Sequence, residues 1–313
     1  MNPLELKVKI LVAGPGTIGA SLALISAACG HDTLLLGRSE GSLERARAAM
    51  VRAAAELAAA GIAPPGLSSW QQQLRAVTGL EQVDSDRELV LEAINEDLAA
   101  KQALFAALEA RLPAQTIFAS STSGLPVDAI GADLAEPGRF AVAHFANPPH
   151  LMPMVELVPG TATRPEVMDA IAAFLAAIGK TPARLRRDIP GHVFNRIQFA
   201  MLREAMALVA DGVAEPHEID TIVKRGLALR LAEEGPLEKM DLAGLQLVHD
   251  VASYLFPDLC RDQQPVLLRR MLEEGRGGAA SGRGFHDWDP ARAQAVIDRR
   301  NAEVIRHLKR LGE

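Results

Sequence analysis

The chain has 313 residues, enough for about two domains, and its formal net charge of −6 argues against a nucleic-acid-binding protein that depends on a basic field. A hydrophobic share of 49% excludes a disordered chain, and two cysteines cannot form a disulfide framework. No Cys/His spacing predicts a metal site, and the longest apolar run, residues 171–178, is too short to span a membrane. We therefore expect a cytoplasmic protein without a membrane segment.

Strand-like and helical segments alternate over the first 190 residues. The predicted strands are Lys7–Ala13, His31–Leu36, Leu89–Ile94, Thr116–Ala119, Arg139–Phe145, Met154–Val158 and Arg184–Arg187, and the predicted helices are Ala20–Cys29, Leu43–Ala60, Asp97–Arg111 and Pro165–Ile178. This alternation predicts an α/β fold with a doubly wound, mostly parallel sheet of the Rossmann type.

The pattern changes after Pro190. A long helix is predicted over His192–Ala210, and the remainder reads as helical without a strand of comparable quality. The sequence thus predicts a Rossmann-type domain over residues 1–190 and an all-helical C-terminal domain over residues 191–313.

A glycine motif, G-x-G-x-x-G, spans residues 14–19 between the first predicted strand and the following helix. At this place Gly14 permits a tight turn, Gly16 lets a pyrophosphate approach the backbone, and Gly19 lets the helix pack on the strand. Thr17 and Ile18 belong to the same expected cofactor-binding segment, because a helix N-terminus offers free N–H groups to a phosphate. The alternative is a glycine-rich connection that binds nothing.

The end of the second predicted strand carries Gly37-Arg38-Ser39, where NAD enzymes usually have an acidic residue for the ribose 2′-hydroxyl. Glycine leaves room for a 2′-phosphate, arginine can pair with it and serine can donate to it. The triplet favours NADP(H) over NAD(H). The alternative is that Arg38 caps a loop and Ser39 caps the next helix.

His144 and Glu156 form the candidate proton-transfer pair. Glu156 is a carboxylate within an apolar strand, so it needs a partner, and His144 lies 12 residues earlier across a Pro-rich turn. An imidazole oriented by a carboxylate is suited to take a proton from a hydroxyl. The alternative is a histidine that merely fills the core.

Two further segments are candidate substrate contacts. Hydroxyls of residues 120–123 follow a strand at its carboxyl end, where doubly wound sheets bind ligands, although serines there also cap helices. Asn195 shares a helix face with Phe199, Leu202 and Met206, so we expect it to point inward, toward protein groups or a substrate carbonyl.

Several motifs together resemble the L-3-hydroxyacyl-CoA dehydrogenase superfamily, including its lambda-crystallin and L-gulonate 3-dehydrogenase branch. They are residues 14–19, 92–96 with Lys101, 120–123, 144–148, Glu156 with Leu157-Val158, Pro190-Gly191 with Asn195-Arg196, 235–237 and 282–285. The resemblance implies a Rossmann-type domain followed by a helical domain that forms a homodimer.

The same resemblance implies a hydride-transfer enzyme in which His144 is the base, Glu156 its partner, and Ser123 and Asn195 hold the substrate oxygens. It further implies that Glu96, Lys101 and Asn147 contact the cofactor. The implied substrate is a 3-hydroxyacyl-CoA such as 3-hydroxybutyryl-CoA.

Departures from the family pattern leave the substrate open. Ser121 stands where the acyl-CoA enzymes commonly have Asn, and His192 stands where Phe is usual. The helix after the second strand carries Arg45, Arg47 and Arg52 but none of the lysines that help to hold CoA in that family. The alternatives are a dehydrogenase of a free hydroxy acid resembling L-gulonate or carnitine, and a non-catalytic protein of the lambda-crystallin kind.

Overall fold

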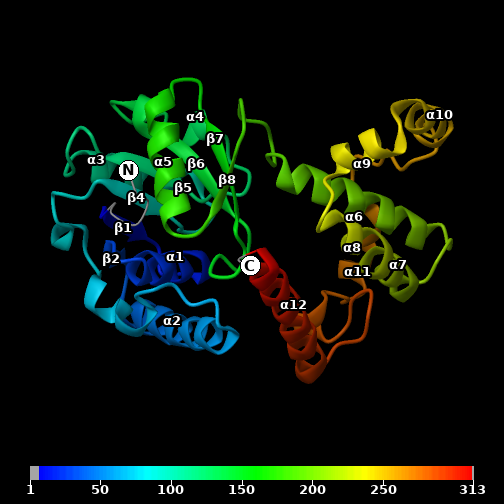
Figure 1. Ribbon diagram of the computed structural model, residues 1–313, viewed down its shortest axis with the longest axis horizontal. Helices are drawn as coiled ribbons and strands as arrows, with labels where there is room; N and C mark the ends of the chain where they lie inside the picture. Colours follow the sequence, from blue (N-terminus) through cyan, green and yellow to red (C-terminus); the bar gives the residue numbers. More distant parts are fainter. Residues whose placement is uncertain (1–6, 312–313) are drawn as a thin grey trace. The chain divides into compact units, whose positions relative to one another are not determined.

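The computed structural model describes residues 7–311 and divides them into two compact units (Figure 1). The first unit contains the described residues up to Asn195 together with those from Asn301 on, and the second contains Arg196–Arg300.

The first unit is built on one eight-stranded sheet in the order β3-β2-β1-β4-β5-β6-β7-β8. The strands are β1 (Lys9–Ala13), β2 (Asp32–Leu36), β3 (Leu74–Val77), β4 (Leu89–Glu92), β5 (Ile117–Ser120), β6 (Phe140–Phe145), β7 (Met154–Pro159) and β8 (Thr181–Arg184). All neighbours pair in parallel except β6 and β7, which are antiparallel. The order reverses beside β1, which confirms the doubly wound, mostly parallel prediction and sets a topological switch point between β1 and β4.

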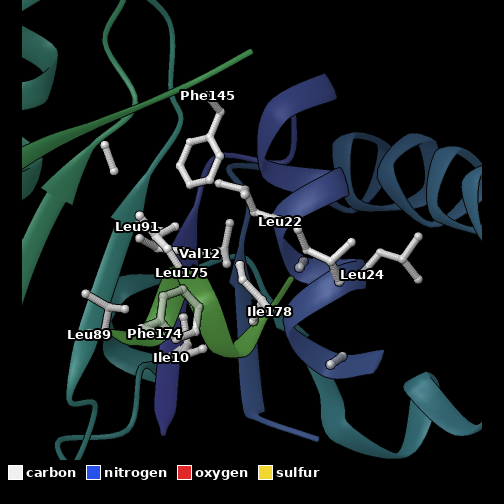
Figure 2. Close-up of a cluster of buried hydrophobic side chains, with 14 of the residues drawn as sticks. Ile10, Val12, Leu22, Leu24, Leu89, Leu91, Phe145, Phe174, Leu175 and Ile178 are labelled. Atoms are coloured by element: carbon white, nitrogen blue, oxygen red, sulfur yellow. The ribbon is translucent and has the colours of Figure 1, made fainter. Parts of the chain in front are cut away.

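Helices cover both faces of the sheet. These helices are α1 (Thr17–Ala28), α2 (Glu40–Ala60), α3 (Leu98–Glu109), α4 (Val127–Ile130) and α5 (Pro165–Ala177). One apolar cluster packs α1, α2 and α5 on one face, with residues such as Val12, Leu22 and Phe174 (Figure 2). A second cluster packs α3 and α4 on the other face, around Phe105 and Phe118. Because both faces are covered, the central strands are buried and their sequences are mostly apolar.

Two edge strands differ from the prediction. Strand β3 was not predicted, because its four residues are partly exposed and carry no apolar run. Strand β8 covers Thr181–Arg184, three residues earlier than the predicted Arg184–Arg187. Pro182 argues against a strand in the interior of a sheet, but β8 is an edge strand, where proline is tolerated.

The second unit is helical, as predicted. Its helices are α6 (Phe194–Ala210), α7 (Pro216–Ile222), α8 (Ala228–Leu231), α9 (Pro236–Ala243), α10 (Leu245–Leu255), α11 (Val266–Glu273) and most of α12 (Pro290–Leu311). No helix among residues 7–311 combines the length and apolar character needed to cross a membrane.

The division lies close to the expected boundary at residue 190 but differs at both ends of the helical part. Residues 191–195 group with the first unit, and so does the last part of α12. Asn301 donates a hydrogen bond of 2.8 Å to Glu56 on α2, and Val304 and Ile305 pack against the core of the first unit. These contacts explain why the end of the chain belongs to the sheet domain.

Candidate active site

The glycine loop joins β1 to α1 at the switch point of the sheet. Gly14 has a φ of +114°, and a Cβ there would lie 2.4 Å from the Ala93 carbonyl oxygen. A Cβ on Gly19 would lie 1.8 Å from the Gly14 carbonyl oxygen, whereas a Cβ on Gly16 would meet nothing within 4 Å. Gly14 and Gly19 therefore allow close packing, and Gly16 leaves the start of α1, with Thr17 and Ile18, open to a ligand. This cradle fits the pyrophosphate of a dinucleotide.

A groove of about 500 Å³ continues from this loop along the ends of β1, β2 and β4. Its polar lining includes Arg38, Ser42, Arg45, Thr78 and Asn95, and it contains no acidic side chain. Within the described chain, no ion pair engages either arginine, and both are exposed. The groove is therefore electropositive where it passes the end of β2.

Gly37 and Ser39 shape the corner between the end of β2 and the start of α2. A Cβ on Gly37 would lie 2.7 Å from the Leu43 side chain and 3.1 Å from that of Pro15, so an acidic residue there requires the neighbours to move. The Ser39 hydroxyl accepts a hydrogen bond from the Ser42 N–H and caps α2. The structure thus gives Ser39 the capping role that was its alternative interpretation.

A buried carboxylate at the end of β4 organises the loop beside the groove. Glu92 is fully buried and accepts hydrogen bonds from the Lys101 ammonium at 2.7 Å, from the Ser120 hydroxyl, and from the Ile94 N–H at 2.6 Å. Lys101 is itself 1% exposed and is not among the groove-lining residues. Lys101 therefore holds α3 against the sheet, behind the surface where a cofactor contact was expected.

Glu96 holds the serine-rich loop that follows β5. Its carboxylate accepts hydrogen bonds from the Thr122 hydroxyl and the Ser123 N–H and lies 3.4 Å from the Lys101 ammonium. Burial would raise the pKa of Glu96, but these hydrogen bonds and Lys101 hold it below its ordinary value. Glu96 is thus an ionised support for Ser123.

His144 and Glu156 face each other across the antiparallel pair β6 and β7. The His144 Nδ1 lies 2.8 Å from Glu156 Oε2, and both side chains are buried. The second carboxylate oxygen, Oε1, accepts the backbone N–H groups of Val193 and Phe194, each at 2.8 Å. Burial would raise the pKa of Glu156, but the bonds from His144 and these two N–H groups hold it below its ordinary value. An ionised Glu156 therefore fixes the orientation of the His144 ring.

Ser123 and Asn195 are brought together, and both lie in the first unit. The Asn195 side-chain amide donates to the Ser123 carbonyl oxygen at 2.9 Å. Asn195 is half-buried, but Phe199 and Leu202, which were expected to point inward with it, are 64% and 39% exposed. That part of the expectation is wrong for the single chain, because an apolar helix face predicts burial without saying what buries it.

Asn147 lies exposed in the turn that follows β6, at the carboxyl edge that also carries the glycine loop. The structure also gives roles to residues for which the sequence predicted none. Thr78 lines the groove, and so do Arg45, which was named only with the arginines of its helix, and Asn95, which with Glu92 was named only as part of the motif at residues 92–96; Glu92 supports the groove. The signal for Glu92 was available, since it is a carboxylate in a buried strand just as Glu156 is.

Comparison with known proteins agrees with this geometry. The sequence matches the NAD-binding domain of 3-hydroxyacyl-CoA dehydrogenases over residues 9–189 and their C-terminal domain over residues 191–288. The chain belongs to the 3-hydroxyacyl-CoA dehydrogenase family. It is an oxidoreductase that uses a nicotinamide cofactor.

Relatives in this family have different substrates. The chain is 36% identical to L-carnitine dehydrogenase of Streptomyces griseus, covering 93% of this chain and 88% of the relative. It is 32% identical to 5-formyl-3-hydroxy-2-methylpyridine 4-carboxylate 5-dehydrogenase of Mesorhizobium japonicum, over 95% of this chain and 96% of the relative. The solved structure of an enzyme of that activity, described as an NAD+-dependent dismutase, aligns with a TM-score of 0.89 at 31% identity over 98% of each chain. A 3-hydroxybutyryl-CoA dehydrogenase from Escherichia coli aligns with a TM-score of 0.74 at 32% identity, over 90% of this chain and 60% of that chain.

Replacing Lys101 by alanine is expected to lower the free energy of unfolding by about 3–5 kcal/mol, because Glu92 would remain as a buried carboxylate without its cation. Urea unfolding followed by circular dichroism measures the change. Arg184→Ala, which removes an exposed ion pair with Asp169, is the control and is expected to change stability little. Equal stability of the Lys101 variant and the wild type would contradict the role of this pair.

Proposed function

We propose that this dehydrogenase interconverts a hydroxyl and a carbonyl group on a small hydroxy acid, with His144 as general acid and base and with NADP(H) preferred. The observation that carries the proposal is the His144–Glu156 pair, buried and hydrogen-bonded at 2.8 Å, at the carboxyl edge of the sheet that also bears the glycine loop.

When bound, the nicotinamide cofactor supplies hydride transfer. In the oxidative direction His144 takes the proton of the substrate hydroxyl, and Glu156 stabilises the resulting imidazolium. In the reductive direction His144 returns that proton to the new alkoxide. Ser123 and Asn195, fixed to each other, hold oxygens of the substrate and so orient the reacting carbon.

The relatives support a free acid over a CoA thioester as the substrate. L-carnitine and the pyridine carboxylate are free acids, and the chain aligns with the relatives named for them over nearly its whole length. The TM-score of 0.89 with the pyridine carboxylate enzyme exceeds the 0.74 with the 3-hydroxybutyryl-CoA enzyme. A 3-hydroxyacyl-CoA is the second candidate, favoured by the family match and by a 32% identical probable 3-hydroxybutyryl-CoA dehydrogenase of Deinococcus radiodurans.

Initial-rate measurements with L-carnitine, L-gulonate and L-3-hydroxybutyrate are expected to show oxidation of free hydroxy acids. Turnover of (S)-3-hydroxybutyryl-CoA alone would select the second substrate class.

Replacing His144 by alanine is expected to lower kcat roughly 10²–10⁴-fold. Nucleotide affinity should stay near the wild-type value, because His144 is not one of the residues that line the groove. Full activity of His144→Ala would remove this residue from the mechanism.

The cofactor preference rests on the corner formed by the end of β2 and the start of α2. A 2′-phosphate there would meet Arg38 and Arg45 together with the hydroxyl of Thr78, and no carboxylate lines the groove to repel it. A larger side chain at Gly37 would have to displace the side chain of Leu43 or Pro15.

NADPH is therefore expected to bind more tightly than NADH. Arg45→Ala is expected to weaken NADPH binding roughly ten- to hundredfold, the loss of a charge-assisted contact, with little effect on NADH. Nucleotide fluorescence titration measures both constants. Arg47→Ala is the control, since Arg47 lies on the same helix outside the groove. A wild-type protein that binds NADH more tightly would contradict the preference.

A homodimer is proposed from the helical unit. Among its residues 196–300, all within the described chain, Met271 is the large hydrophobic side chain that is buried, whereas Phe199, Leu247 and Tyr254 are 64%, 59% and 71% exposed. A groove of about 820 Å³ between α6 and residues 262–270 is also lined largely by apolar side chains. A unit of this size without its own core needs a partner, and a second copy in closed symmetry is the commonest partner.

Light scattering is expected to give twice the mass of one chain. Phe199→Glu is expected to shift the mass toward the monomer and to lower the thermal midpoint, because a charge would have to be buried in the interface. Val51→Glu, a change at an apolar residue that is 53% exposed in the first unit, is the matched control. A wild-type protein of single-chain mass would contradict the dimer.

A further inference from the structure

A second imidazole lies beside the proton-transfer pair. The His192 ring centroid is 5.5 Å from that of His144, and the residue has no exposed surface. Its backbone φ is +50°, and no other non-glycine residue in the described chain has a positive φ. A buried polar ring in an unfavourable backbone conformation persists only where the surrounding structure holds it in place.

The segment that carries His192 is fixed on both sides. Asp188 accepts the Val127 N–H at 2.8 Å, and the N–H groups of Val193 and Phe194 bind Glu156. His192 is thereby directed inward. Neither of its ring nitrogens meets the geometry of a hydrogen bond with any residue of the described chain, although Nδ1 lies 3.4 Å from a carboxylate oxygen of Asp188.

The charged and polar groups that face His192 come from each packed element. They are His144 from β6, Glu156 from β7, Asp188 from its own loop and the Thr122 backbone after β5. Burial lowers the pKa of His192, and His144 lowers it further, against the opposing effect of Asp188, Glu156 and the Thr122 backbone. A charge on His144 therefore disfavours a second charge on His192, and the Asp188 carboxylate 3.4 Å from Nδ1 favours the tautomer with hydrogen on Nδ1.

We propose that His192 is a positioning residue for the His144–Glu156 pair, and that its neutral, Asp188-oriented imidazole supports the positive charge that His144 carries after taking the substrate proton. This inference rests on the proposed role of His144 as the base. A polar ring is worth more next to a developing charge in a buried site than in water, because the local dielectric constant is low. A phenyl ring of similar shape would fill the same space without this support.

The test compares His192→Phe with the wild type in two measurements. One is the pH dependence of the oxidation rate, and the other is the titration of the His144 imidazole by NMR, assigned with His144→Ala. Loss of the support is expected to move the acid limb of the rate profile and the NMR titration of His144 to lower pH by about half to one pH unit. His192→Gln, which keeps a polar group, is expected to restore part of the shift, and nucleotide affinity should not change.

Two further variants separate this role from a structural one. Asp188→Asn keeps the His192 ring but removes the orienting charge, and it is expected to shift both measurements in the same direction. His31→Phe is the matched control, since His31 is also a buried imidazole with an unpartnered Nε2 among the described residues, packed on Phe174. It is expected to shift neither measurement.

Each failure has its own signature. Unchanged profiles in His192→Phe and Asp188→Asn would overturn the inference, and so would an equal shift in His31→Phe. Wild-type turnover in His144→Ala would instead overturn the proposed function, and the NMR titration would still report whether the two rings are coupled.

Discussion

The burial of the Glu156 carboxylate constrains more of this site than any other interaction. A buried carboxylate is costly unless its oxygens are hydrogen-bonded. Glu156 meets this requirement with His144 from β6 on one oxygen and with the N–H groups of Val193 and Phe194 on the other. One side chain thereby fixes the orientation of the candidate base and the start of α6. Asn195 follows directly in the chain, so the same contact also positions a residue that we propose binds the substrate.

Glu92 applies the same principle at the neighbouring end of the sheet. Its bonds to Lys101, Ser120 and the Ile94 N–H join β4, α3 and β5 and shape the loop that lines the nucleotide groove. Glu96 extends the support to Ser123. The site is therefore a set of loops held in place by hydrogen-bonded carboxylates.

The sequence predicted the parts of this arrangement that depend on local pattern. The alternation of strands and helices predicted the sheet, and the single carboxylate in Met154–Val158 predicted that Glu156 needs a partner. The short Pro-rich turn made His144 its nearest candidate, and the structure places the two directly opposite. The backbone donors of Val193 and Phe194 could not be predicted in this way, because they approach from 37 and 38 residues along the chain.

Other features escaped prediction because they depend on what lies around a segment rather than on its own pattern. Strand β3 was not predicted and β8 was predicted three residues too late, because both are short edge strands without the apolar runs that identify buried strands. Arg45 was grouped with the arginines of its helix, and only the packing of α2 directs it to the groove while Arg47 lies elsewhere. By contrast, the capping role of Ser39 was one of two interpretations open from the sequence, and a hydroxyl that accepts the Ser42 N–H can still donate its own hydrogen.

The distribution of charge reconciles a protein of net charge −6 with anionic ligands. Every acidic side chain of the site is already committed: Glu92 to Lys101, Glu96 to Thr122 and Ser123, and Glu156 to His144 and two N–H groups. Arg38 and Arg45, in contrast, are exposed along the groove. Because Glu92 and Glu156 are buried and no carboxylate lines the groove, the groove surface that a phosphate meets is positive despite the acidic composition of the chain. Two carboxylates that would repel these ligands from the surface, Glu92 and Glu156, therefore act from beneath it and hold the loops of the site in place.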